Sequence, residues 1–198
     1  MPSPLAHGFA GYAILMLAEP RMAADFRSNL KAMGTGIFFG GLADADFFVA
    51  YFTKNPVLQH HYFSHSIPFT LLIGLILYPI LKWVLKINRP FRMSGILTVI
   101  YGSHLFQDYF THDGSVPIGI PLLWPFSHQH FKAPLEIFMS IHRGGMENLF
   151  GAHNMDAMIR EFFIMAPLAL ASYLYARKKF NRQNAKTPRK NSNPTLAS

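Results

Sequence analysis

Apolar residues in this chain are gathered into long blocks separated by short polar segments, a pattern typical of helices in an apolar environment. Five such blocks predict helices over Leu5–Ala18, Ala32–Phe52, Ser66–Ile87, Met93–Phe110 and Phe162–Ala176. The third is the strongest, because Ile67–Leu81 carries no charge and extension to Lys86 gives about 30 Å of helix, enough to cross a bilayer. A kink is expected at Pro79. The pattern therefore predicts an all-α, integral-membrane bundle of about five helices, the shorter ones tilted or interfacial.

The segment between the fourth and fifth blocks, Thr111–Glu161, is rich in glycine, proline and histidine. Its prolines make long regular helix unexpected before about Pro134, so it reads as a long non-cytoplasmic loop. From Arg177 onward the chain is basic and polar, a composition typical of disorder. We therefore expect one membrane-embedded domain over residues 1–180 and a disordered basic tail over 181–198. The first block lacks a charged leader and predicts a retained helix rather than a cleaved signal peptide.

Composition agrees with a membrane protein, since 51% of the residues are hydrophobic and only 14% are charged. Soluble domains carry about 25% charged residues. The chain has no cysteine, which excludes disulfides, thiolate metal ligands and a cysteine nucleophile. Any bound metal must be held by nitrogen and oxygen atoms.

The net charge of +8 is distributed unevenly if the five helices cross a membrane alternately. One side then receives 14 of the 18 basic residues: Arg21, Arg27, Lys31, Lys82, Lys86, Arg89, Arg92, Arg177, Lys178, Lys179, Arg182, Lys186, Arg189 and Lys190. Loops rich in lysine and arginine stay in the cytoplasm, so the C-terminus is expected inside and the N-terminus outside. Basic residues spread over loops and a tail, away from a shared aromatic surface, argue against nucleic-acid binding.

The same partition puts all ten histidines and eight of the ten carboxylates on the non-cytoplasmic side or at helix ends facing it. The simplest alternative is a bundle whose histidines sit at the interface without a function. A one-sided distribution of every histidine favours a functional site instead.

Candidate metal ligands come from every one of the first four blocks or their ends: His7, Asp44, Asp46, His60, His61, His65, His104 and Asp108. The i, i+4 spacing of His104 and Asp108 places both side chains on one helical face, where they can share a cation. A carboxylate in a membrane helix costs at least ~2.5 kcal/mol unless it is paired or hydrated, and a bound divalent cation would account for it. Imidazole and carboxylate ligands suit zinc or manganese, and five to seven of them suit two ions better than one.

These residues resemble the family of small integral-membrane metal-dependent hydrolases, which includes an SOS-regulated inner-membrane protein. The shared features are an N-terminal histidine, an acidic pair after small residues, a histidine–serine segment, a helix reading S-H-x-x-x-D and the run PLLWPF at residues 121–126. The likeness covers residues 5–131. HHYFSHS departs from the HRGLTHS typical of the family, which leaves open which of His60, His61 and His65 binds metal.

The resemblance implies a multi-pass protein of the bacterial inner membrane, with membrane lipids around it. It also implies a distant similarity to the zinc-dependent phospholipase C and single-strand nuclease group. By that likeness Asp44, His60 or His65, His104 and Asp108 would hold one metal, and His7 a second, with Asp108 bridging. A third set would come from His112, His142, His153 and Asp156.

The expected function is metal-assisted hydrolysis of a phosphoester or lipid-linked substrate, with Asp46 orienting a water or taking its proton. Trp124 and Phe126 are expected to anchor the loop at the membrane interface. The alternative from another class is a transport or metal-handling protein that uses the same histidines and aspartates. Transit would require polar groups to continue across the membrane, and Ile67–Leu81 and Phe162–Ala176 offer none.

Overall fold

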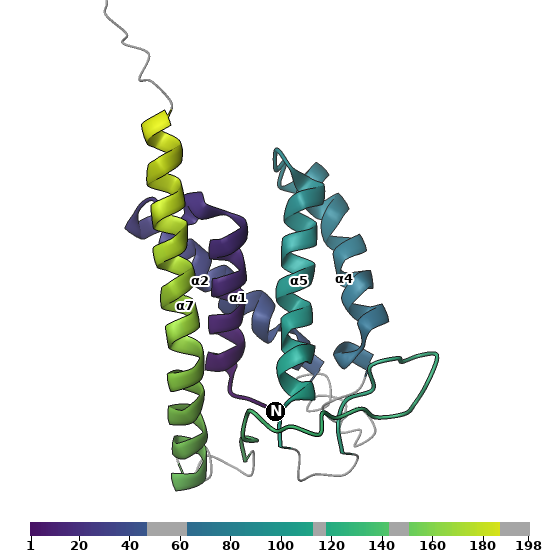
Figure 1. Ribbon diagram of the computed structural model, residues 1–198. Helices are drawn as coiled ribbons and strands as arrows, with labels where there is room; N and C mark the ends of the chain where they lie inside the picture. The colour runs from purple at the N-terminus through teal and green to yellow at the C-terminus, as the bar shows by residue number, and fades with distance from the viewer. Residues whose placement is uncertain (47–62, 113–117, 143–150, 187–198) are drawn as a thin grey trace, which may run out of the picture.

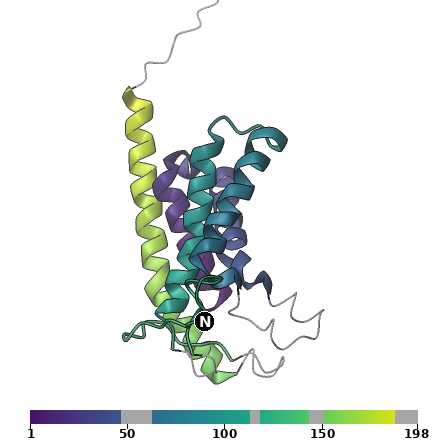
Figure 2. The ribbon, with the colours of Figure 1, turned by 90° about the vertical axis from the view of Figure 1, so that its right-hand side faces the viewer.

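The computed structural model describes residues 1–46, 63–112, 118–142 and 151–186. Five long helices lie roughly side by side in this part of the chain: α1 (Pro4–Ala18), α2 (Phe26–Gly41), α4 (Ile67–Pro79), α5 (Pro90–Tyr109) and α7 (Ala152–Lys186). α1 packs against α2, α5 and α7, whereas α4 packs against α5 (Figure 1). In the view turned by 90°, α7 and α4 lie on opposite sides of α1 and α5 (Figure 2). The predicted all-α bundle of about five helices is confirmed.

The helices begin at residues with clear local causes. Ser3 caps α1 and Asp25 caps α2, each side chain accepting a hydrogen bond from a backbone N–H three residues later. Ser66 does the same for α4. Because Asp25 is a strong cap, α2 starts at Phe26, six residues before the apolar block that predicted it. A 3₁₀ turn, Leu42–Ala45, follows α2 and carries Asp44.

Two helix ends differ from the sequence prediction. Instead of a simple kink at Pro79, Ile80–Val84 forms a π-helical turn, in which the Leu85 N–H donates to the Ile80 carbonyl. α7 continues to Lys186, although disorder was predicted from Arg177. Lysine, arginine and glutamine are good helix formers, so the polar composition alone was a poor guide to where the helix ends. Residues 187–198 lie outside the described part.

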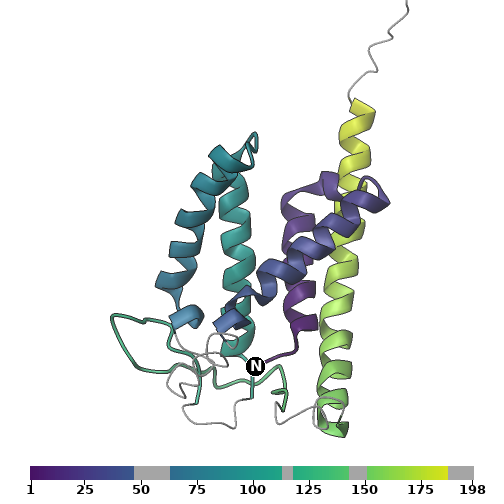
Figure 3. The same cartoon turned by 180° about the vertical axis from the view of Figure 1, so that it is seen from behind.

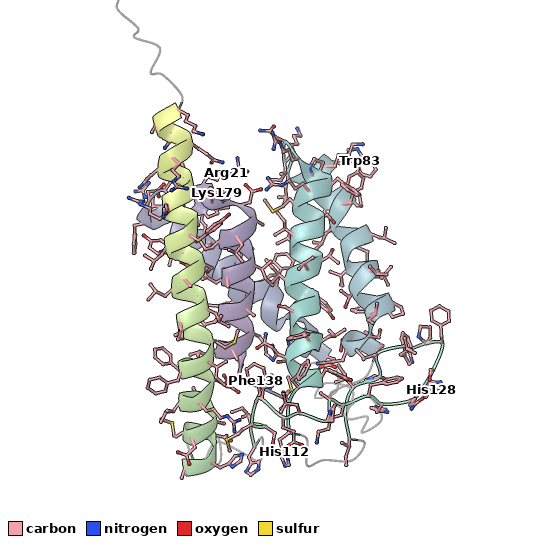
Figure 4. All side chains as sticks on the ribbon, in the orientation of Figure 1. Arg21, Trp83, His112, His128, Phe138 and Lys179 are labelled. Atoms are coloured by element: carbon pink, nitrogen blue, oxygen red, sulfur yellow. The ribbon has the colours of Figure 1, made fainter. Side chains whose placement is uncertain are left out.

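Among the described residues, two segments are long and apolar enough to cross a membrane, Ile67–Val84 and α7. The irregular chain at residues 118–142 lies at the end of the bundle where the N-terminus is found (Figure 1). Arg21, Trp83 and Lys179 lie at the opposite end of the bundle. His112 and His128 lie at the same end as the irregular chain, to which His128 belongs (Figure 4). The basic and histidine-rich regions are thus at opposite ends of the molecule.

The basic end is held together by two arginines from different helices. Arg92 of α5 pairs with Glu19 and donates to the Ala18 carbonyl at 2.5 Å, where α1 ends. Arg177 of α7 donates to the Ala23 carbonyl at 2.6 Å. Both guanidinium groups therefore satisfy carbonyls that have no partner inside a helix.

α1 and α2 cross at glycines, and this crossing determines where the metal-ligand candidates lie. A Cβ on Gly36 would stand 2.4 Å from the Tyr12 nitrogen, and one on Gly40 would stand 2.4 Å from the His7 carbonyl oxygen. Only glycine permits this approach, as in the small-xxx-small contacts of membrane helices. Figure 3 shows α2 passing obliquely over α1 toward the lower end of α5.

We predict opposite effects for two glycines on α2. Gly36→Ala should destabilise the protein by about 1–3 kcal/mol, because its methyl group meets the α1 backbone. Gly34→Ala should stabilise it by about 0.5–1 kcal/mol, since a Cβ there meets nothing within 4 Å. Thermal unfolding in detergent, followed by circular dichroism, measures both. Equal midpoints for the two variants would contradict a tight helix crossing at Gly36.

Candidate metal centre

Side chains from four separate segments meet at the histidine-rich end of the bundle. They are His7 of α1, Asp44 of the turn after α2, His65 of the 3₁₀ turn Phe63–His65, and His104 and Asp108 of α5. The side chains of His7, His65, His104 and Asp108 are fully buried, and that of Asp44 is 20% exposed. The convergence predicted from the sequence is therefore present in the structure.

Donor atoms of this cluster lie close together. His65 Nε2 lies 3.2 Å from both His104 Nε2 and Asp108 Oδ2. Asp44 Oδ1 lies 3.7 Å from His65 Nε2 and 3.4 Å from His104 Nε2. Asp108 Oδ2 is 3.2 Å from His104 Nε2. Ligand atoms about 2.0–2.2 Å from a shared tetrahedral cation stand about 3.3–3.6 Å apart, so these separations are close to those found around a bound ion.

His7 lies beside these donor atoms. Its ring stacks on that of His104, with centroids 3.7 Å apart, and its Nε2 lies 3.8 Å from Asp108 Oδ1. Asp108 therefore presents Oδ2 to His65 and His104, and Oδ1 to His7. Both ring nitrogens of His7 are buried and lack a hydrogen-bond partner among the described residues, which is costly for an imidazole unless a ligand binds there.

Two groups of three ligands could each hold an ion, namely His7 with Asp44 and His104, and His65 with His104 and Asp108. Within each group the ligand atoms lie within 4.8 Å of one another. The donor set is imidazole nitrogen and carboxylate oxygen, which suits a divalent transition-metal ion. The residues present thus fit a bound metal.

Hydrogen bonds at the Nδ1 atoms of His104 and His65 fix the direction of the two imidazole rings. His104 Nδ1 donates to the Gly40 carbonyl at 2.7 Å, which leaves Nε2 as the donor atom for a metal. On His65, Nδ1 lies 2.9 Å from the Ser64 hydroxyl and 3.3 Å from Asp46 Oδ2. Ser64 in turn donates to Asp46 at 2.6 Å. Histidines bound to metals commonly have such partners on the far nitrogen.

The electrostatics of the site favour positive charge. Burial would lower the pKa of the His65 imidazole, but hydrogen bonds to Asp108, Asp44 and Asp46 outweigh burial and hold this pKa well above its usual value. The carboxylates that stabilise a proton on His65 would stabilise a metal cation in its place, and the cation would displace the proton.

Asp46 lies beside Nδ1 of His65, whereas the other candidate ligands lie near its Nε2. The sequence suggested that this carboxylate orients or deprotonates a water, and this role stays a prediction. Its contacts include the Ser64 hydroxyl and Nδ1 of His65. The contributions of Ser64 and Gly40 could not be read from the sequence. A serine and a glycine carry no metal-ligand signal, and their partners are distant in the chain.

Glu161 is a third residue whose structural role the sequence did not reveal. Its buried carboxylate, on α7, accepts hydrogen bonds from the Ser3 backbone N–H at 3.0 and 3.1 Å and pairs with the Ser3 hydroxyl. Ser3 caps α1 one turn before His7. Glu161 therefore ties the start of α1, and with it His7, to α7.

Other sequence predictions have different outcomes. His60 and His61 lie outside the described residues. His112 pairs with Glu136 at 2.7 Å, and the rings of His142 and His153 stack with centroids 3.8 Å apart. Within the described ranges the groups able to hold an ion are the two given above, and the expected third set is not among them. Phe126 is 86% exposed, and its role as a membrane anchor stays a prediction.

The chain is similar to one known protein family. Residues 1–180 match the family model described as YdjM inner membrane protein. No curated protein and no solved structure matches the chain. The match extends over far more than half of the sequence and includes every ligand of the cluster. This protein therefore belongs to the YdjM inner membrane protein family, which is the family of membrane-bound metal-dependent hydrolases whose likeness the sequence had shown.

Proposed function

We propose that this protein is a hydrolase of the bacterial inner membrane that uses a divalent metal, zinc or manganese, to cleave a phosphoester in a lipid or lipid-linked substrate. The observation that carries the proposal is the pair of three-ligand groups, His7 with Asp44 and His104, and His65 with His104 and Asp108. A divalent cation bound there would supply Lewis acidity, polarising a phosphoryl oxygen and lowering the pKa of a water to near 7.

The protein's own residues divide into two groups by their exposure. His65, His104 and Asp108 are buried and hold their donor atoms in fixed directions. Asp44 is the part-exposed ligand, so a substrate approaches the cluster from its side. His7, with both nitrogens available and Asp108 Oδ1 nearby, would provide a second cation position with fewer protein ligands. Catalytic metal sites keep such an open position, whereas structural sites are closed by four protein ligands.

Asp46 and Ser64 act in this proposal as positioning residues. They hold the proton on Nδ1 of His65 and keep its Nε2 directed at His104 and Asp108. Carboxylate–histidine–metal arrangements of this kind also increase the basicity of the ligating nitrogen. Proton transfer by Asp46 itself is the competing role, and the two can be separated by experiment.

We expect the protein purified in detergent to contain one or two zinc or manganese ions per chain. His104→Gln and Asp108→Asn should abolish binding, because each removes a buried ligand of the cluster, and His7→Gln should remove the second ion only. His128→Gln is the matched control, since His128 is exposed. Elemental analysis measures the content.

The same preparations should hydrolyse bis-p-nitrophenyl phosphate, with the rate following the metal content. Metal-free wild-type protein would contradict the proposed site altogether. Bound metal without hydrolysis, together with metal uptake into proteoliposomes, would instead support a metal-handling protein.

The two roles of Asp46 predict different kinetics. If Asp46 positions His65, Asp46→Asn and Ser64→Ala should both weaken metal binding about 10- to 100-fold, measured by chelator competition. Hydrolysis should then recover when metal is saturating. Unchanged metal affinity with a low kcat in Asp46→Asn alone would show that this carboxylate transfers the proton.

We also propose that the metal cluster faces the non-cytoplasmic side. The support is the placement of Arg21 and Lys179 at the other end of the bundle (Figure 4), because basic residues favour the cytoplasm. A C-terminal alkaline phosphatase fusion should be inactive and a C-terminal fluorescent-protein fusion active. The reverse result would place the cluster in the cytoplasm.

A further inference from the structure

An apolar groove of about 600 Å³ lies between α1, α2 and α7. It extends along α1 from Pro4 to Tyr12, about 12 Å at 1.5 Å per residue. The volume is typical of a site for one elongated small molecule. None of the candidate metal ligands that the structure describes lines the groove, so the groove is separate from the metal cluster. Figure 3 shows the three helices that form it.

The lining offers a ligand almost no polar group. Met33 and Ile37 of α2 and Leu170 of α7 form its rim and are 47%, 52% and 58% exposed. Ala166 and Ala169 of α7 contribute only methyl groups. In an inner-membrane protein, exposed apolar residues of this kind face lipid, so the groove opens sideways to the hydrocarbon of the bilayer.

The long axis of the groove leads away from the end of α1 that carries His7. It begins at Pro4, at the end of α1 that carries His7, and extends toward the middle of the bundle. At its far end the hydroxyl of Tyr12 donates to Asn29 at 2.7 Å, so this polar group is already satisfied. A hydrocarbon chain lying in the groove would therefore point away from the cluster, with its polar end at the cluster's level.

A path along α2 connects the groove to the cluster. Met33, Ile37 and Gly41 follow one another at i, i+4 and i+8 and so share one face of the helix, and Asp44 comes three residues later. A Cβ on Gly41 would meet nothing within 4 Å, so the face is open beyond Ile37. The path ends at Asp44, the part-exposed ligand of the cluster.

We propose that the groove binds one long hydrocarbon chain of the substrate, whose phosphoester head group reaches the metal cluster at Asp44. The proposal rests on the proposed hydrolase function and specifies its substrate as a lipid of the same leaflet. A second copy of this chain is the competing occupant. The apolar lining, the opening toward the bilayer and the path to Asp44 favour the lipid.

Two variants of α7 with the same chemical change provide the test. Ala166→Phe fills the groove, and Ala171→Phe adds the same ring at an exposed position that does not line it. The substrates are p-nitrophenyl hexadecyl phosphate and p-nitrophenyl ethyl phosphate, which share a leaving group and differ in chain length. In both variants, unchanged metal content and unfolding temperature show that the fold is retained.

We expect wild type and Ala171→Phe to have a higher kcat/KM for the hexadecyl ester than for the ethyl ester. In Ala166→Phe the ratio of the two kcat/KM values should fall about tenfold. A tenfold loss corresponds to about two methylene groups that stay in water. An equal preference in all three proteins would overturn the groove as the chain-binding site. If Ala166→Phe proves unstable, Met33→Trp, which narrows the same groove from its exposed rim, replaces it.

A labelling experiment tests occupancy without hydrolysis. The three proteins are reconstituted in nanodiscs with a phosphatidylcholine that carries a diazirine in one acyl chain, then irradiated and digested. Labels on Met33 or Leu170 that are lost only in Ala166→Phe support the groove as the chain-binding site. This conclusion would stand even if neither ester were hydrolysed. Absence of hydrolysis would refute the hydrolase function alone. Equal labelling in all three proteins, or cross-links between two chains through Met33→Cys, would overturn the lipid occupant.

Discussion

The arrangement of this bundle depends on the need to neutralise carboxylates buried among apolar helices. Asp44, Asp46 and Asp108 converge at one end, and each would be costly in a membrane-embedded protein without a positive partner. The histidines supply nitrogen atoms but no permanent charge. A divalent cation would supply two positive charges among these three carboxylates, and the ligand atoms of each three-residue group lie within 4.8 Å of one another. Removing a single carboxylate or imidazole would leave the rest of the cluster unbalanced, so the ligands act as a unit.

The cluster can form only because the helices approach unusually closely. Gly40 lies against the His7 backbone on one side, and its carbonyl accepts the hydrogen bond from His104. One residue without a side chain thus links α1, α2 and α5, and it does so through backbone atoms. The same closeness leaves α2 crossing α1 obliquely, which separates α2 from α7 along part of its length (Figure 3). Tight packing at the metal cluster and an open groove on the other face of α1 are therefore two consequences of one helix crossing.

Much of this could be predicted from the sequence where the signal is local. The i, i+4 spacing of His104 and Asp108 fixed their common face, and the long apolar blocks located the helices. The roles of residues whose partners are distant in the chain could not be predicted. Asp46 looked like a free carboxylate because its partner, Ser64, is distant in the chain. The start of α2 was missed because a capping aspartate lies in a polar segment. The extension of α7 was missed because composition does not distinguish a solvated helix from a disordered tail.

The two ends of the molecule have opposite chemistry, and this bears on how a substrate would be handled. At the basic end, Arg92 and Arg177 are occupied with the carbonyls that end α1 and the turn after it, so they serve the structure. At the other end, the polar groups point inward to one small volume with a part-exposed edge at Asp44. A substrate dissolved in water could reach Asp44 from outside, but it would gain nothing from the apolar groove. A lipid substrate would gain both contacts at once if its chain lay in the groove while its head group reached Asp44, as we propose. Binding energy from the chain could then be used to hold the phosphoester at the metal, which a small diester cannot do.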